Sequence, residues 1–340
     1  MPGNFHIHMK KLYALLPILA ALLVPGKAAA QMMPDSTVQV VAYWKLGDKQ
    51  YYRYESTQFK IKQQDTVVAK RSAGIISMEV ISADEEKGYR LKVSTLESQE
   101  SDPIAEALNE QIGKNFGAED CYIDTDPYGT IQQFSIPEGL GECQEDLIKM
   151  VSDALKQKYP DENPDIFLPF LRQMITPEHL VAMATNLYSP LFMFHGARLA
   201  LSEKYEFEDN VPSIFTDGTM KMSGYFWVNE EATDEESVLL QLTKTADKEE
   251  LKPFLFNNLN AIIQNMAKDM DQETLTSDLE KLYDTAKMSI TDQIVEVVHL
   301  DTGWPIEYLF RRDVEMVISD EAGGQITQTT FTIIPQEEEQ

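Results

Sequence analysis

Near its C-terminus the chain reads Ile306-Glu307-Tyr308-Leu309-Phe310-Arg311-Arg312-Asp313-Val314-Glu315-Met316-Val317-Ile318. The stretch alternates with the period of two residues that is typical of a β-strand with one buried face. We expect that face to carry Ile306, Tyr308, Phe310, Val314, Met316 and Ile318, with Arg312 as the interruption. Gly323-Gly324 then turns the chain back into a second predicted strand over 325–334. The two strands predict a hairpin of an antiparallel sheet.

The N-terminal part of the chain shows the same alternation. Its clearest strand alternates apolar with polar residues, namely Tyr89, Arg90, Leu91, Lys92, Val93 and Ser94. Further strands are predicted over 38–44, 51–61 and 75–81, so residues 36–97 form an antiparallel meander with one solvent-facing side. Later strands are predicted over 121–126, 130–136, 219–229, 237–245 and 294–300.

Helical patterns separate the groups of strands. One apolar stripe consists of Leu147, Ile148, Val151 and Leu155. Thr176-Pro177-Glu178 opens another helix, Asp247 with Glu250 opens a third, and Ser277 with Glu280 opens a fourth that extends to Ile290.

This order of elements predicts an α+β fold. We expect a curved antiparallel β-sheet, made of the meander and the C-terminal hairpin and packed by amphipathic helices. The sequence predicts a single domain over 31–336, with a helical middle at 142–201 and a strand, helix and strand part at 203–334. A division into two domains is the alternative. Residues 337–340 are predicted to be a disordered tail.

The first 30 residues have the pattern of a cleavable signal peptide. Lys10 and Lys11 precede an apolar run from 12 to 24, and Ala28-Ala29-Ala30 provides the small residues of a cleavage site. Translation is expected to begin at Met9. The alternative is a membrane anchor, which needs about 20 apolar residues, more than this run contains. We therefore expect export to the periplasm or the exterior, and no transmembrane anchor in the mature chain.

Export makes a disulfide between Cys121 and Cys143 chemically feasible, and these are the only cysteines. In the chain-entropy model such a bond stabilises the fold by roughly 3 kcal/mol. The alternative is a pair of buried thiols. A metal site is not expected, because neither cysteine has the neighbouring ligands of a zinc site.

The composition excludes several classes of protein. Lys and Arg number 29 against 56 Asp and Glu, which gives a formal charge of −27 and excludes a nucleic-acid binder with a general basic surface. A hydrophobic content of 43% excludes a disordered chain. The acidic runs, such as Glu230-Glu231, are interpreted as solvated surface, with weak binding of divalent cations as the alternative.

No catalytic motif is recognisable. The mature chain has three histidines, His179, His195 and His299, and none is spaced for a metal site or belongs to an HExxH motif. Asp124, Asp126 and Gly129 are better explained by a hairpin turn than by a calcium loop. The sequence therefore predicts no cofactor, no metal and no identifiable catalytic residue.

The aromatic residues Phe167, Phe170, Phe192 and Phe194 lie in a strongly apolar region that could line a site for a hydrophobic ligand. The alternative interpretation is that these side chains only pack helices against the sheet.

Two turn motifs carry a resemblance to known proteins: a Gly47-Asp48 turn followed by tyrosines, and a late turn at Asp301-Thr302-Gly303-Trp304. In outline the chain resembles exported bacterial β-rich proteins of uncharacterised function, and more distantly the lipoprotein-carrier fold. That resemblance implies a curved antiparallel sheet closed by helices over an apolar cavity, and it implies no catalytic residue.

Three hypotheses about function follow. The first is a non-enzymatic exported envelope protein that binds an apolar ligand, such as a lipid or lipoprotein, or a protein partner. The second is an exported hydrolase with an unrecognised carboxylate or histidine site. The third is a scaffold that pairs with partners through exposed strand edges.

Overall fold

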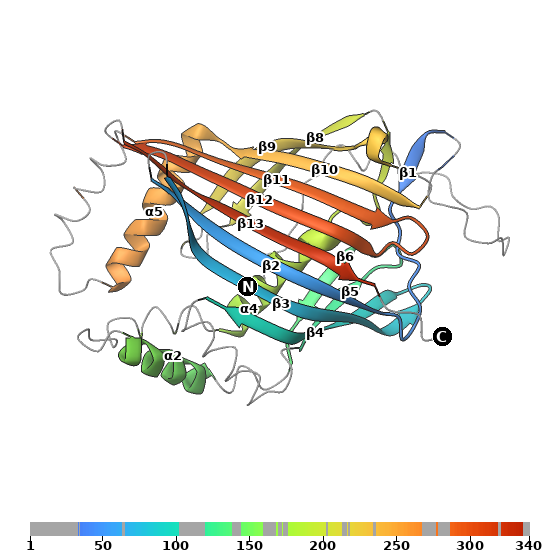
Figure 1. The fold of residues 1–340 in the computed structure, drawn as a ribbon, viewed down its shortest axis with the longest axis horizontal. Helices are drawn as coiled ribbons and strands as arrows, with labels where there is room; N and C mark the ends of the chain where they lie inside the picture. Colours follow the sequence, from blue (N-terminus) through green and yellow to red (C-terminus); the bar gives the residue numbers. More distant parts are fainter. Residues whose placement is uncertain are drawn as a thin grey trace.

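Eleven strands of the described chain form one continuous antiparallel sheet, in the order β6-β5-β4-β3-β2-β13-β12-β11-β10-β9-β8 (Figure 1). The computed structural model describes residues 33, 35–62, 65–101, 120–137, 144–158, 168, 172, 176–201, 203–212, 216, 218–233, 236–266, 277, 286–318 and 321–335. The sheet consists of β2 (Lys49–Lys62), β3 (Asp65–Asp84), β4 (Gly88–Glu100), β5 (Asp120–Thr125), β6 (Ile131–Ser135), β8 (Lys204–Pro212), β9 (Thr219–Val228), β10 (Ser237–Ala246), β11 (Lys287–His299), β12 (Pro305–Ile318) and β13 (Glu321–Ile334).

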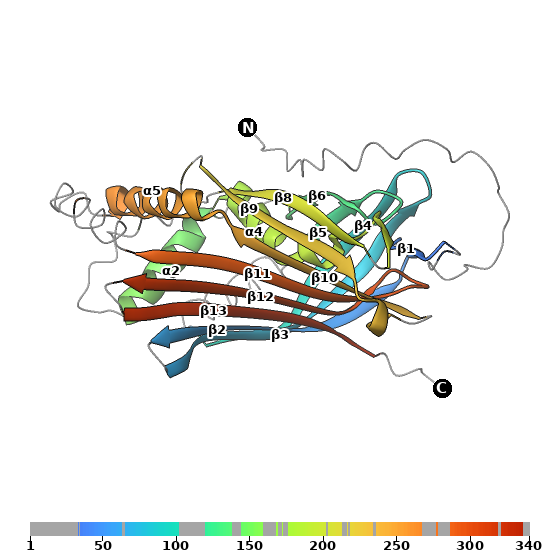
Figure 2. The same ribbon diagram turned by 90° about the horizontal axis from the view of Figure 1, so that it is seen from above.

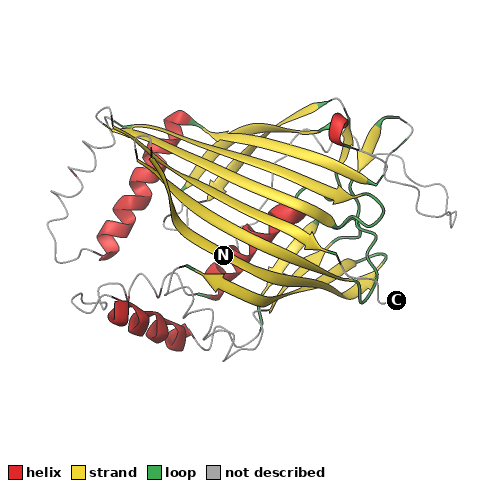
Figure 3. Ribbon diagram, in the orientation of Figure 1, coloured by secondary structure: helices red, strands yellow, loops and turns green. Residues whose placement is uncertain are grey.

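A small second sheet and several helices complete the described structure. The small sheet pairs β1 (Thr37–Gln39) with β7 (Arg198–Ala200). The helical elements are α2 (Gln144–Lys158), α4 (Pro177–Tyr188), α5 (Lys248–Met266) and the short 3-10 helices η4 (Ser189–Phe192) and η5 (Glu230–Ala232) (Figure 3). The predicted fold class, α+β with a curved antiparallel sheet, is confirmed.

The large sheet is curved and open, and α4 lies on its concave side (Figure 2). Its edge strands β6 and β8 curl toward the side on which α4 lies, and α4 contacts β6. Tyr188 at the end of α4 packs against Phe331 of β13, with ring centroids 6.3 Å apart. The sheet is therefore divided into a concave face, which is partly covered by α4 and η4, and a convex outer face.

The alternation in β12 explains its position in the middle of the sheet. Tyr308, Phe310, Arg312 and Val314 share the concave face, because a strand places every second side chain on the same side. Tyr308 is buried and lies opposite Phe331 of β13. Leu309 and Arg311 lie on the convex face between these residues. The predicted period of two is therefore confirmed, and Arg312 lies on the face that the sequence pattern assigned to it.

One end of the concave face is closed by an aromatic cap, which we define as Trp44, Tyr89, Phe192, His195 and Trp304. The rings of Trp44 and Trp304 are stacked with centroids 4.6 Å apart, and Phe192 contacts the edge of Trp44. Gly303 precedes Trp304 with φ of 74°, and a Cβ at this position would overlap the carbonyl oxygen of Val41. Only glycine fits this close turn without strain. We call this the capped end of the sheet.

At the opposite end, α5 packs against β9 and β11 and covers a second apolar cluster (Figure 1). The buried members of that cluster are Met220, Met222, Ala246, Leu251 and Ile290. Asp247 caps the helix, since its side chain accepts hydrogen bonds from the backbone N–H groups of Glu249 and Glu250 at 2.8 and 3.2 Å. The predicted helix start is confirmed. We call this the α5 end of the sheet.

Three local predictions differ from the structure. Of the strand expected over 38–44, only the first two residues form a strand, as part of β1. Beyond it the backbone N–H groups of Val40, Ala42 and Tyr43 bond to three different loops, at Ala197, Tyr128 and Thr302, because the segment runs across the capped end. The helix expected to reach Ile290 is wrong at its end, since β11 already begins at Lys287. Strand β8 had not been predicted.

Several predictions lie outside the described residues. These are the signal peptide at 1–30, Cys143, Phe167, Phe170 and the tail at 337–340. Cys121 is buried at the start of β5, and its disulfide with Cys143 stays a prediction. In the part of the chain that is described, no helix is both long and apolar enough to cross a membrane.

Candidate functional site

A row of polar side chains crosses the concave face from one strand to the next. Neighbouring strands place its members directly opposite one another in register. In order from β10 to β3 they are Lys244, Asp292, Arg312, Thr327, Gln58 and Lys70, which we call the polar row. On its capped side lie Ile294 and Leu242 of the main core, and on its α5 side lie Ile290 and Ala246 of the second cluster. The row therefore separates two apolar regions.

The centre of the row is an ion pair with two parallel hydrogen bonds. Arg312 donates from Nε and Nη2 to the two carboxylate oxygens of Asp292 at 2.7 and 2.8 Å. The Asp292 side chain is only 1% exposed, whereas Arg312 is 36% exposed. Hydrogen bonds to Asp292 raise the pKa of the Arg312 guanidinium above its ordinary value, so the guanidinium is charged. A carboxylate this deeply buried requires such a partner.

A second ion pair extends the row toward the sheet edge. Lys244 donates to Asp209 of β8 at 2.6 Å, and both side chains are largely buried. The lysine reaches across Gly224 of β9, which lies directly opposite it and leaves room because it has no side chain. Charges therefore alternate from Asp209 through Lys244 and Asp292 to Arg312, across the five strands from β8 to β12.

The concave face beside Arg312 is only half-buried. Phe310 lies two residues away, with its ring centroid 5.7 Å from the guanidinium carbon. Thr329 and Ser56 share a hydrogen bond of 3.0 Å on the neighbouring strands. Val314 on the other side of Arg312 is also half-buried. Apolar and hydrogen-bonding groups thus lie next to each other on a surface that solvent or a ligand can reach.

Glu296 is the unusual residue of the main core. It lies on the concave face of β11, opposite Leu240 and Tyr308 in register, and it is completely buried. Neither carboxyl oxygen has a hydrogen-bond partner. Burial in this apolar environment raises the pKa of Glu296 well above its ordinary value, so the neutral acid is the form that the fold holds.

His195 in the aromatic cap does not have the surroundings of a catalytic histidine. Its Nε2 donates to the carbonyl oxygen of Gly303 at 2.8 Å, and Nδ1 has no partner. Burial lowers the pKa of the His195 ring to about 4, so the ring is neutral at neutral pH. A hydrolase would orient such a ring with an acid or a hydroxyl group, and among the described side chains none does so. Among the described residues no three His, Cys, Asp or Glu side chains form a group that could hold a metal ion.

The predicted ligand-contacting phenylalanines fall into two groups. Phe192 and Phe194 are buried at the capped end, where Phe192 packs on Trp44 and Phe194 packs on Phe226 at 5.9 Å. Phe167 and Phe170 lie outside the described residues. The structure therefore describes only two of the four, and the role of all four as ligand contacts stays a prediction.

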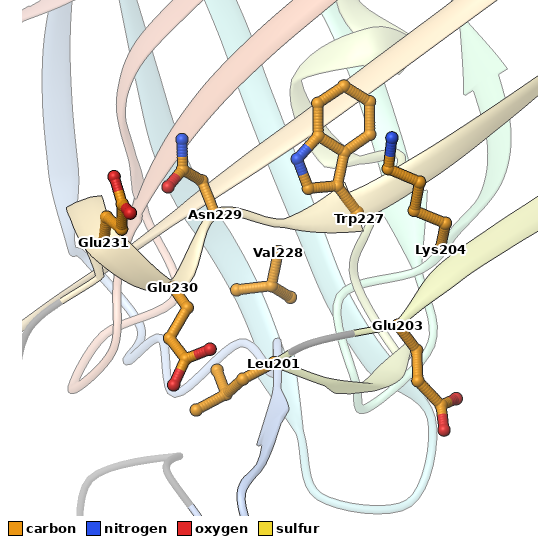
Figure 4. Close-up of a pocket in the computed structure, with 8 residues that line it drawn as sticks. All are labelled: Leu201, Glu203, Lys204, Trp227, Val228, Asn229, Glu230 and Glu231. Carbon is orange, nitrogen blue, oxygen red and sulfur yellow. The ribbon is translucent and has the colours of Figure 1, made fainter.

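A shallow surface pocket of about 250 Å³ lies near the sheet edge, around Trp227 and Lys204 (Figure 4). Three acidic residues line it, including Glu230 and Glu231 from the acidic run noted in the sequence. The carboxylates do not converge, since Glu203 and Glu230 point to the side opposite to the indole ring of Trp227 (Figure 4). We therefore do not assign a cation site here.

The comparisons with known proteins identify no family. No family model and no curated protein matches the chain. Seven solved chains match in structure. One, described as lipid-protein interactions in lipovitellin, has 9% identity and a TM-score of 0.41 over 87% of this chain and 26% of the other. The chain thus spans about a quarter of that structure.

Another match is Ail, the attachment invasion locus protein of Yersinia pestis, with 4% identity and a TM-score of 0.17 over 85% of this chain and 100% of the other. Both TM-scores are below 0.5, so neither likeness supports an argument about function. The curved sheet implied by the resemblance to the lipoprotein-carrier fold is present. No family model supports that resemblance.

Proposed function

We propose that the protein is an exported, non-enzymatic binding protein that takes an amphiphilic, lipid-like ligand on the concave face of its sheet. The observation that carries the proposal is the polar row, which crosses a half-buried part of that face between two apolar clusters. A ligand with a hydrocarbon chain and a polar end matches this surface, because its chain can contact apolar side chains and its polar end can contact the polar row.

The free energy of burying apolar surface favours contact between a ligand and the half-buried part of the concave face. Phe310, Val314 and Met316 on β12 are half-buried, in contrast to the fully packed side chains around the aromatic cap. Covering apolar surface gains about 25 cal/mol per Å². The polar row remains satisfied only if the covering molecule brings polar atoms of its own to that position. A purely hydrocarbon ligand would exclude water from Arg312 and Thr327 and would offer no hydrogen-bonding atoms in its place.

Uptake of a fluorescently labelled phospholipid by the purified mature chain tests this proposal. The variant Phe310→Thr should bind the probe about fivefold more weakly, since loss of part of the aromatic contact corresponds to about 1 kcal/mol. Leu309→Thr is the matched control, because Leu309 is half-buried in the same strand but lies on the convex face. Failure of the unaltered chain to take up the probe, or equal losses in both variants, would contradict the proposal.

Export is tested separately by producing the full chain in a bacterium with a secretion system. We expect the protein in the periplasm or the medium to begin at Gln31, as determined by N-terminal sequencing. Replacing Lys10 and Lys11 by Glu should retain the unprocessed chain in the cytosol, since a positive segment precedes the apolar run in a signal peptide. A chain that keeps residues 1–30 in the exported fraction would exclude cleavage at this site.

The edge strand β8 does not favour the scaffold hypothesis. The outer strand β8 exposes Lys204, Glu206 and Glu208 and ends at Pro212. Charged side chains and proline are typical of edge strands that avoid pairing with other chains.

A further inference from the structure

We infer that the polar end of the ligand is an uncharged head group with hydroxyls, such as the glycerol of a monoacylglycerol. We place this head group over four uncharged polar side chains of the concave face. They are Ser56 and Gln58 of β2 and Thr327 and Thr329 of β13, which we call the uncharged patch. This inference rests on the proposed function and names its ligand class.

The strand register makes the uncharged patch a compact block. Ser56 lies directly opposite Thr329, and Gln58 lies directly opposite Thr327. At the usual strand geometry the four side chains cover about 5 Å across the strands and about 7 Å along them. This area is close to the size of a glycerol group. All four side chains are half-buried, so a ligand that lies on the concave face can reach them.

The patch can both donate and accept hydrogen bonds. Each hydroxyl is one donor and two acceptors, and the amide of the glutamine also has both functions. Ser56 and Thr329 share a hydrogen bond of 3.0 Å, which uses only part of this capacity. The next hydroxyl across the sheet, Ser72, donates to Glu100 at 2.6 Å. A head group with hydroxyls matches such a surface, because it too donates and accepts, whereas a carboxylate only accepts and an ammonium only donates.

The charged side chains beside the patch are balanced. Arg312, opposite Thr327, donates from both Nε and Nη2 to Asp292, and Lys70, opposite Gln58, also has an interaction partner. From the row of Ser56 to the α5 end, the register places equal numbers of basic and acidic residues on this face among the described strands. The five basic residues are Lys60, Lys62, Lys70, Lys244 and Arg312, and the five acidic residues are Asp65, Glu100, Asp209, Asp292 and Glu321.

This balance disfavours a charged head group. A charge that leaves water must be compensated by an opposite charge at its new position, or binding loses free energy. Because the face has no excess of either sign, an anion gains no more there than a cation. An uncharged head group pays no such penalty, and its hydroxyls replace the water that they displace from the patch.

The apolar neighbours of the patch place the hydrocarbon chain. Phe310 lies opposite Thr329, and Val314 and Met316 follow on the same face of β12 toward the α5 end, all half-buried. Between them Arg312 contributes the aliphatic part of its side chain. A chain attached to the head group can therefore lie along β12. A free polyol would leave these apolar side chains uncovered, so we commit to an acylated glycerol.

The test compares three lipids that have the same acyl chain: monomyristoylglycerol, myristate and myristoyl lysophosphatidylcholine. Binding to the mature chain is measured by calorimetric titration and native mass spectrometry, at a pH at which myristate is ionised. We expect monomyristoylglycerol to bind at least about tenfold more tightly than either other lipid. This preference should be the same at low and high salt, because it does not depend on attraction between charges. Glycerol alone is the fourth arm.

The double variant Ser56→Ala/Thr329→Val should weaken binding of monomyristoylglycerol about fivefold and reduce its preference over lysophosphatidylcholine. The variant removes both partners of the shared hydrogen bond, so neither is left unpaired in the folded protein. Thr57→Val/Thr330→Val is the matched control, because these half-buried threonines are the next residues in the same strands and lie on the convex face. It should keep the affinity of the unaltered chain.

The outcomes separate the two proposals. No binding of any of the three lipids overturns the proposed function and this inference with it. If myristate or lysophosphatidylcholine binds at least as tightly as monomyristoylglycerol, or if the two double variants lose affinity equally, the inference alone is overturned. Binding of glycerol alone as tight as that of monomyristoylglycerol would show a site for a free polyol and overturn the assignment to a lipid.

Discussion

Replacing Arg312 by Met should lower the free energy of unfolding by about 3–5 kcal/mol, because the substitution leaves the Asp292 carboxylate buried without its partner. Asp292 is 1% exposed and receives both of its short hydrogen bonds from this one side chain. Urea unfolding at neutral pH, followed by far-UV circular dichroism, measures the loss.

The adjacent residue provides a matched control. Arg311 pairs with Asp313 at 2.9 Å on the convex face, where the two side chains are 44% and 25% exposed. Arg311→Met should cost less than about 1 kcal/mol, since exposed ion pairs contribute little. Equal losses in the two variants would show that burial of Asp292 does not determine the effect of Arg312→Met.

The double variant Arg312→Met/Asp292→Leu removes the pair as a unit. We expect it to recover most of the lost stability, because replacement of a buried ion pair by apolar side chains is often neutral. Because we expect this variant to fold without the guanidinium, it also separates the contribution of Arg312 to folding from its contribution to ligand binding.

The sequence pattern predicted most of the sheet because each long strand carries its own alternation. In β12 the apolar residues recur every second position, and the same holds for Leu91 and Val93 in β4. Strand β8 escaped prediction because the alternation of Tyr205 and Phe207 with Glu206 and Glu208 is short and is interrupted at Asp209, a charged residue on the inward face. On an edge strand the outward positions are charged, and that pattern is easily mistaken for a loop.

The candidate site could be predicted only in part. Arg312 was visible as an interruption of an apolar face, and this is the one signal that the sequence carried. Its partner Asp292 and the neighbouring Lys244 could not be identified, since the register between β10 and β11 is set across a long excursion of the chain through α5. Cross-strand neighbours depend on that register, which alternation alone does not fix.

The aromatic cap illustrates the same limit. Trp44 and Trp304 are far apart in the sequence, and each lies in or next to a turn. Their stacking depends on Val40 to Tyr43 running across the sheet end, where three loops provide the hydrogen-bond partners. Local propensity contains no information about such contacts.

Glu296→Gln should stabilise the protein by an amount that increases with pH. Burial raises the folded-state pKa of Glu296 well above the ordinary value of 4.5 that applies to the unfolded chain. Below 4.5 both states hold the proton, and the residue contributes no pH dependence. Above it the unfolded chain releases the proton while the folded chain retains it, so the stability falls by up to about 1.4 kcal/mol per pH unit until the folded-state pKa is reached.

Glutamine has nearly the same shape as the protonated acid and does not titrate, so the variant removes this loss. The stability of the two proteins should be similar in acid and should diverge toward alkaline pH, as measured by urea unfolding across the range. Glu307→Gln is the control, since Glu307 is exposed on β12 and its replacement should give a difference that does not change with pH. A constant difference for Glu296→Gln as well would mean that this carboxyl is ionised in the folded protein. The apolar core between β10 and β12 would then have to contain a cation or water that satisfies it.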